Sequence, residues 1–110
     1  MIFDSNETTT IITQEKESVV EMVKKLEVLY ERFKNDNVIV SLTSLTNIPL
    51  ENIVEFFQIS NKHRKAKHSF VIVSDKVNLD DIPDEIIVVP TMQEAYDVIE
   101  MEEIERDLGF

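Results

Sequence analysis

The side chains best suited to binding or chemistry lie in one polar turn, between a short apolar run and an amphipathic segment. Val38 to Val40 is apolar and β-branched, which favours an interior strand. In α/β folds the carboxyl end of a strand and the amino end of the next helix meet at such a turn, so we expect a binding site here. Its candidate residues carry hydroxyl and amide groups: Ser41, Thr43, Ser44, Thr46 and Asn47.

The residue types needed for catalysis are scarce. The single glycine rules out glycine-rich phosphate loops, and no serine stands in a G-x-S-x-G elbow. Acidic residues are many, but no pair is marked by its neighbours for acid/base work. His63 and His68 are five residues apart with no evident third ligand, which argues against zinc. We expect no enzyme, no catalytic residue, no metal and no cofactor.

The run from Lys62 to His68 holds 4 of the 11 basic residues and both histidines. A nucleic-acid site would need aromatic side chains nearby for base stacking, and the run has none. Cations at the carboxyl end of a helix, where they complement its dipole, explain the run better. We therefore expect no nucleic-acid partner.

The length of 110 residues fits one domain over residues 1–110. The absence of cysteine excludes disulfides and thiolate chemistry and suits a reducing compartment. The first residues lack a basic segment followed by an apolar one, and no apolar run approaches the length of a membrane span. These features predict a cytoplasmic protein with no membrane partner.

The net charge of −11 is concentrated in one part of the chain. Residues 1–74 carry 10 acidic and 9 basic residues, whereas residues 75–110 carry 12 acidic and 2 basic ones. The negative electrostatic potential of this acidic part repels phosphate backbones and could steer the protein toward a basic partner. The acidity could also serve solubility alone.

Three helices are predicted from periodicity. The first spans about Lys16 to Lys34, with Ser18 and Glu21 as a capping box that falls late enough to allow an earlier start. The second runs from near Pro49 to about His63 and should turn one apolar face to the core: Leu50, Ile53, Val54 and Phe57. The third opens at Thr91 with a capping box to Glu94 and ends before Gly109.

Strands are predicted at Ile2–Phe3, 8–13, 38–40, 70–73 and 86–89. The first two are joined by a turn, and the later ones alternate with helices. Alternation of this kind implies crossover connections, so we expect an α/β fold with a sheet of four or five mainly parallel strands and an antiparallel edge.

Three segments resemble the STAS domain, the module of anti-sigma factor antagonists and of sulfate-transporter tails. Residues 38–48 (VIVSLTSLTNI) are similar to the family's central strand and turn, residues 68–73 to its next strand, and residues 88–95 (VVPTMQEA) to its closing strand and T-x-x-E-A helix start. The resemblance covers nearly the whole chain. It implies helices gathered largely on one face of the sheet and a regulatory, protein-binding role.

The chain departs from the family at its signature, which runs Asp-Ser-Ser-Gly-Leu and carries a serine phosphorylated by an anti-sigma kinase. The matching positions here are Pro49 to Ile53, and Glu51 stands where the phosphorylated serine would be. Glu51 and Asn52 thus join the candidate partner-binding residues. The glutamate either imitates the phosphorylated state or marks a decayed switch.

The functional prediction is a non-catalytic STAS-like regulatory or interaction module without the phosphorylatable serine, which binds an anti-sigma-factor-like or other protein partner. The alternative is a small-molecule or nucleotide sensor that uses the same strand-end crevice. An accessory subunit of a nucleic-acid enzyme would need a basic surface outside residues 62–68. Short chains with a similar acidic ending are sometimes called ribonuclease Z, but that nuclease requires a metal cluster of histidines and aspartates that this chain lacks.

The acidic end, Glu100 to Phe110, also carries an apolar stripe at helical spacing, formed by Met101, Ile104 and Leu108. We expect this helix to project beyond the core. The stripe would then dock on a second copy of the chain, giving a homodimer, or on a partner with a basic rim.

Overall fold

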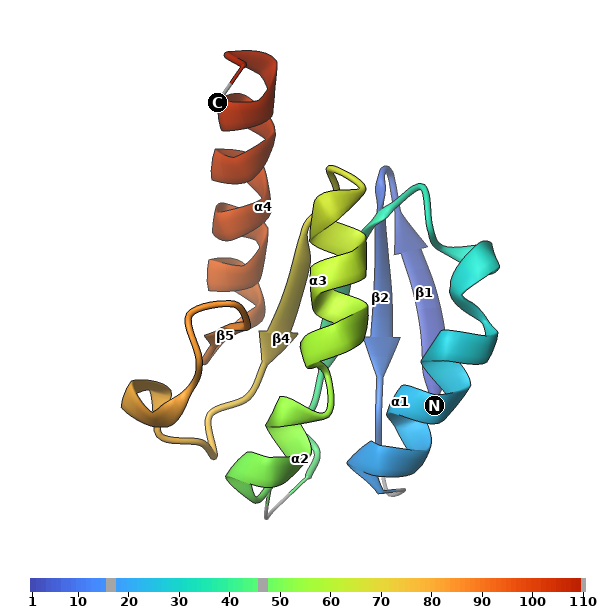
Figure 1. The fold of residues 1–110 in the computed structure, drawn as a ribbon, viewed down its shortest axis with the longest axis vertical. Coiled ribbons are helices and arrows are strands. Elements are labelled where there is room, and N and C mark those ends of the chain that lie inside the picture. The colour runs from blue at the N-terminus through green and yellow to red at the C-terminus, as the bar shows by residue number, and fades with distance from the viewer. Residues whose placement is uncertain (16–17, 46–47, 110) are drawn as a thin grey trace.

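The computed structural model in Figure 1 describes residues 1–15, 18–45 and 48–109. Within these residues, five strands form one sheet in chain order: β1 (Ile2–Asn6), β2 (Thr9–Thr13), β3 (Asn37–Ser41), β4 (Phe70–Val73) and β5 (Ile87–Val89). β1 pairs antiparallel with β2, and the pairs from β2 to β5 are parallel. The predicted α/β fold, with its mainly parallel sheet and antiparallel edge, is confirmed.

The helices lie largely on one face of the sheet, as the family resemblance implied. The helical elements are α1 (Val19–Val28), the 3-10 turn η1 (Tyr30–Arg32), α2 (Leu50–Val54), α3 (Phe57–Lys65), the 3-10 turn η2 (Leu79–Asp81) and α4 (Met92–Asp107). Side chains from α1, α2 and α3 share one core with β2, β3 and β4. Side chains of α4 form a smaller core on the opposite face.

The central strands are buried on both faces. Val38 and Val40 of β3 face the core under α1 to α3, whereas Ile39 faces α4. Val71 of β4 is completely buried on the α4 side. Because helices cover both faces, positions 38–40 of β3 and all of β4 are apolar, the pattern of a buried parallel sheet.

Both predicted capping boxes are formed. The backbone N–H of Glu21 donates to Ser18 Oγ at 3.0 Å, so α1 begins directly after Ser18 rather than earlier. The N–H of Glu94 donates to Thr91 Oγ1 at 3.1 Å at the start of α4. Gly109 follows α4 with a φ of +84°, a conformation that glycine adopts without strain.

The first helix is shorter than predicted. α1 ends at Val28, and the chain continues through η1 instead of one helix to Lys34. Most apolar residues at helical spacing in this segment are still buried, including Tyr30 and Phe33 beyond the end of α1. Periodicity therefore identified the buried side of this segment. It did not predict the change to a 3-10 turn, because the apolar spacing continues through that turn.

The second predicted helix is wrong in its continuity and in its buried face. It is divided into α2 and α3 by Glu55 and Phe56. Ile53 and Phe56 are completely buried. Leu50, Val54 and Phe57 are exposed, although the sequence assigned them to the core. The segment carries two apolar stripes side by side, and their spacing does not say which one meets the sheet.

Candidate functional site

An exposed apolar stripe runs along α2 and the start of α3, directly after the predicted binding turn. Leu50, Val54 and Phe57 retain 40%, 42% and 37% of their surface. They stand at i, i+4 and i+7, so they lie along one side of the helical path. Isolated exposed apolar residues are ordinary on a protein surface, but an aligned set beside a groove is typical of an interaction site.

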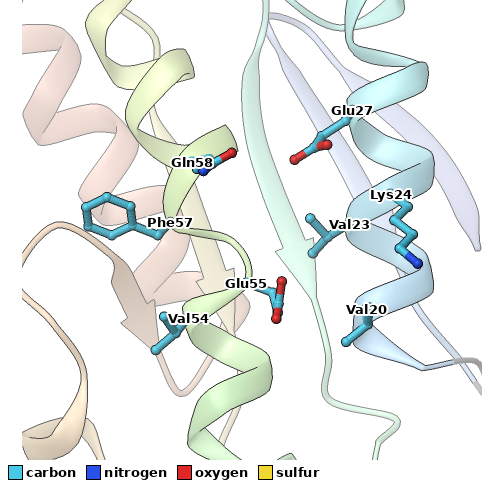
Figure 2. A pocket seen from close by; sticks show the side chains of 8 residues that line it. All are labelled: Val20, Val23, Lys24, Glu27, Val54, Glu55, Phe57 and Gln58. Carbon is cyan, nitrogen blue, oxygen red and sulfur yellow. The ribbon is translucent and has the colours of Figure 1, made fainter.

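The groove lies between α1 and the α2–α3 segment and has a volume of about 490 Å³. α1 contributes Val20, Val23, Lys24 and Glu27, and the opposite wall contributes Val54, Glu55, Phe57 and Gln58. Figure 2 shows Glu55 and Gln58 turned toward α1, with Phe57 and Val54 turned to the other side of the same wall. The groove and the stripe therefore share Val54 and Phe57, whose side chains turn away from α1.

The groove continues toward the carboxyl end of α3. A second cavity of about 210 Å³ shares Glu27 and Gln58 with the first and adds Tyr30, Ile59 and Lys62. Lys62 Nζ lies 4.3 Å from the centre of the Tyr30 ring, a cation–π contact. Two lysines and two glutamates line the combined groove, so its formal charge is balanced. This combination of apolar floor and mixed charges suits an amphipathic protein segment.

The predicted turn residues differ in how exposed they are. Ser41 ends β3 and is buried, and its Oγ lies 3.2 Å from Thr43 Oγ1. Thr43 and Ser44 are exposed in the turn beyond the strand. Thr46 and Asn47 lie outside the described residues. The structure thus brings Ser41 and Thr43 together and leaves Thr43 and Ser44 accessible to a partner.

Glu51 and Asn52 lie in the short helix α2. Glu51 is exposed in the first turn, where a carboxylate is favoured by the helix dipole. Asn52 is half-buried, and its backbone N–H donates to the carbonyl of Pro49 at 2.9 Å. Both residues are in the same helix as Leu50 and Val54, so Glu51 and the apolar stripe belong to one surface region.

Buried polar side chains gather at the carboxyl ends of the parallel strands. Gln14, just after β2, is completely buried, and its backbone N–H donates to the carbonyl of Ser41 at 3.1 Å. Gln14 Nε2 donates to the carbonyl of Ser18 at 3.3 Å, but Gln14 Oε1 has no hydrogen-bond partner among the described residues. Ser74, after β4, is also buried. Buried polar atoms therefore lie at the strand ends, next to the predicted turn.

A buried histidine joins the two walls of the groove. His63 of α3 is completely buried, with Nδ1 2.8 Å from the Tyr30 hydroxyl and Nε2 2.6 Å from the carbonyl of Asp36. Because a carbonyl only accepts, Nε2 carries the proton, and Nδ1 accepts from the tyrosine. Burial lowers the pKa of His63. In the sequence this histidine belongs to a basic run and to a histidine pair unsuited to zinc, and neither pattern indicates that it is buried.

Two other basic side chains of that run also have structural partners. Arg64 Nη2 lies 3.1 Å from Glu102 Oε2 of α4, and Lys62 Nζ lies over the Tyr30 ring. Among the described residues, no three histidine, cysteine, aspartate or glutamate side chains come together as a possible metal site. None of the helices in the described ranges has the length and hydropathy required to span a membrane.

Comparison with known proteins adds no family to this description. No protein-family model matches the sequence, and a search of the curated proteins gives no match.

Proposed function

We propose that this chain is a non-catalytic, STAS-like regulatory module that binds a protein partner through the turn after β3, helix α2 and the adjoining groove. The observation that carries this proposal is the exposed stripe of Leu50, Val54 and Phe57 beside the groove of about 490 Å³. Burying what remains exposed of Val54 or Phe57 against a partner would contribute roughly 1 kcal/mol each.

The strand order and the position of the turn support the STAS-like assignment. The turn after β3 leads into α2, which holds Glu51 at the position of the family's phosphorylated serine. Glu51 is exposed, so a partner that approaches the stripe would meet its carboxylate. Its single negative charge either substitutes for a phosphoserine or is left from a decayed switch, and in both cases partner binding is independent of phosphorylation.

Capture of partners by three immobilised versions of the chain tests the proposal. Val54→Asp places a carboxylate in the stripe, whereas Val28→Asp makes the same change at an α1 position that is 81% exposed and does not line the groove. A true partner should be captured equally by the wild type and Val28→Asp and reduced at least about tenfold with Val54→Asp. Equal capture by all three versions, measured by quantitative mass spectrometry, would exclude this surface.

The second candidate function is a small-molecule or nucleotide sensor at the strand-end crevice. Gln14 Oε1, which has no partner within the described residues, favours it because a buried acceptor is normally hydrogen-bonded. A sensor would show a rise in thermal stability with a nucleotide panel, and Gln14→Leu would remove that rise. The interaction module predicts no such rise.

A cytoplasmic location belongs to the same proposal. The chain contains no cysteine, which is compatible with a reducing compartment, and an anti-sigma-factor-like partner would be found there.

A further inference from the structure

A second open surface lies on the opposite face of the sheet, beside α4. The contacts of α4 are concentrated on β3, β4 and β5. Figure 1 accordingly shows α4 on the β5 side of the sheet, with β1 and β2 at the other side. A groove of about 380 Å³ separates α4 from the turn between β1 and β2.

This surface has apolar side chains available for contact. Ile2 is 44% exposed, and its register with Thr13, Ser41 and Val73 places it on the face that α4 covers elsewhere. On α4, Ile104 lines the groove and is half exposed, and Met101 and Leu108 extend the apolar side along the helix. The predicted exposure of this stripe is confirmed.

The charges lining the groove all have one sign. Glu7 of the β1–β2 turn faces a row on α4 formed by Glu100, Glu103 and Asp107, and no lysine or arginine is among the lining residues. Glu103 of this row is held in place, because its Oε1 accepts from Asn37 Nδ2 at 3.1 Å. An acidic wall above apolar side chains is complementary to a cationic amphipathic partner.

We propose that a lysine- or arginine-rich amphipathic helix of a partner protein packs beside α4 on this surface, as a second helix of that layer. Its apolar side would cover Ile2 and Ile104, and its cations would face the carboxylates of Glu100 and Asp107. A second copy of this chain is a poor occupant. Its exposed α4 stripe is bordered by the same acids, and Glu51 lies beside its α2 stripe, so both would bring like charges together.

The probe for this test is a synthetic amphipathic helix with leucines on one side and lysines on the other, with a version bearing glutamates instead of lysines as its control. Binding is followed by fluorescence anisotropy with the full chain. Glu100→Lys/Asp107→Lys should weaken the lysine peptide about tenfold, because two attractions become repulsions. The glutamate peptide should not bind the wild type.

Asp97→Lys/Glu105→Lys is the matched control, since it makes the same change of charge on α4 outside the groove. It should retain most of the affinity, and amide shifts on binding should map to residues 6–9 and 96–107. An equal loss in both double variants would reduce the effect to general attraction and overturn the proposal. Amide shifts confined to α1–α3 would also overturn the proposal. So would a wild-type dimer that only Glu100→Lys/Asp107→Lys dissociates, because a second copy would then occupy this surface.

Discussion

Tyr30 and His63 form a buried hydrogen bond between η1 and α3, beside the cavity that Tyr30 lines. Tyr30→Phe removes the hydroxyl that donates to His63 Nδ1 and leaves a buried acceptor without a partner. We predict a loss of about 1–3 kcal/mol in the free energy of unfolding, measured by urea denaturation. Tyr96→Phe is the control, because the Tyr96 hydroxyl accepts only a long, exposed bond of 3.4 Å from Asn6. A loss no larger than that of the control would contradict the assignment.

The same histidine predicts a pH dependence of stability. Burial is the largest effect and lowers the pKa of His63 from its ordinary value of 6.5. The hydrogen bond to the Asp36 carbonyl opposes this in part, and the charge of His68, a smaller effect, acts in the same direction as burial. Below pH 6.5 the unfolded chain therefore binds more protons at this site than the folded chain does. The contribution of His63 is complete above pH 6.5 and is lost as the pH falls through its lowered folded pKa.

The corresponding measurement compares the free energy of unfolding of the wild type and His63→Gln across this pH range. Glutamine has a donor and an acceptor but does not titrate, and subtraction removes the background from the carboxylates. We predict that the wild type loses stability relative to the variant as the pH falls. Parallel curves would mean that His63 does not titrate differently in the two states.

Phosphorylation is a further prediction at the residue scale. Glu51 has no hydroxyl, so an anti-sigma kinase should add no phosphate at the position of the family's serine. Thr43 and Ser44 are exposed and could accept one instead, whereas Ser41 is buried. Intact-mass measurement after incubation should show an unmodified chain. A stoichiometric phosphate on Thr43 or Ser44 would show that the switch has moved within the turn.

At the scale of elements, the sequence predicted the strands and caps well. Val71 and its neighbours form an apolar run that only a strand covered on both faces explains, and Thr91 with Glu94 is a local signal that needs no tertiary information. The phase of α2 and α3 could not be predicted. Ile53–Val54 and Phe56–Phe57 each offer two adjacent apolar residues, and only packing against the sheet selects one of each pair.

The groove between α1 and α3 could not be predicted either, since no sequence pattern records the distance between two helices. The same limit applies to His63. A histidine within a basic run gives no sign that it will be buried, and its bond to the carbonyl of Asp36 depends on how η1 returns to β3. The polar turn at Ser41 was predictable because it follows from the strand–helix connection alone.

The acidic end of α4 is better anchored than its sequence suggested. Ser69 is completely buried, donates to Glu102 Oε1 at 2.6 Å and accepts from Arg106. We predict that Ser69→Ala lowers the free energy of unfolding by about 1.5–3 kcal/mol, because hydrogen bonds to charged groups are lost. Ser44→Ala, at an exposed position, should change it by less than about 0.5 kcal/mol. Equal effects of the two substitutions would show that this contact does not fix α4.

At the scale of the whole molecule, the two faces of the sheet offer two surfaces of different character. The surface over α1 to α3 is apolar with balanced charge, whereas the surface beside α4 is acidic. Binding to the acidic surface should weaken as salt concentration rises, and binding to the balanced groove should change little. The two proposals can therefore fail independently of each other.

The central claim is that a protein partner contacts the stripe on α2 and α3. The most direct measurement is to place a photo-crosslinking amino acid at Phe57 or, as the matched control, at Val28, and to irradiate the native cells that express each version. The account predicts one discrete crosslinked protein from position 57, recovered at the same mass in repeated experiments, and none from position 28. The same products from both positions, or none from either, would contradict it.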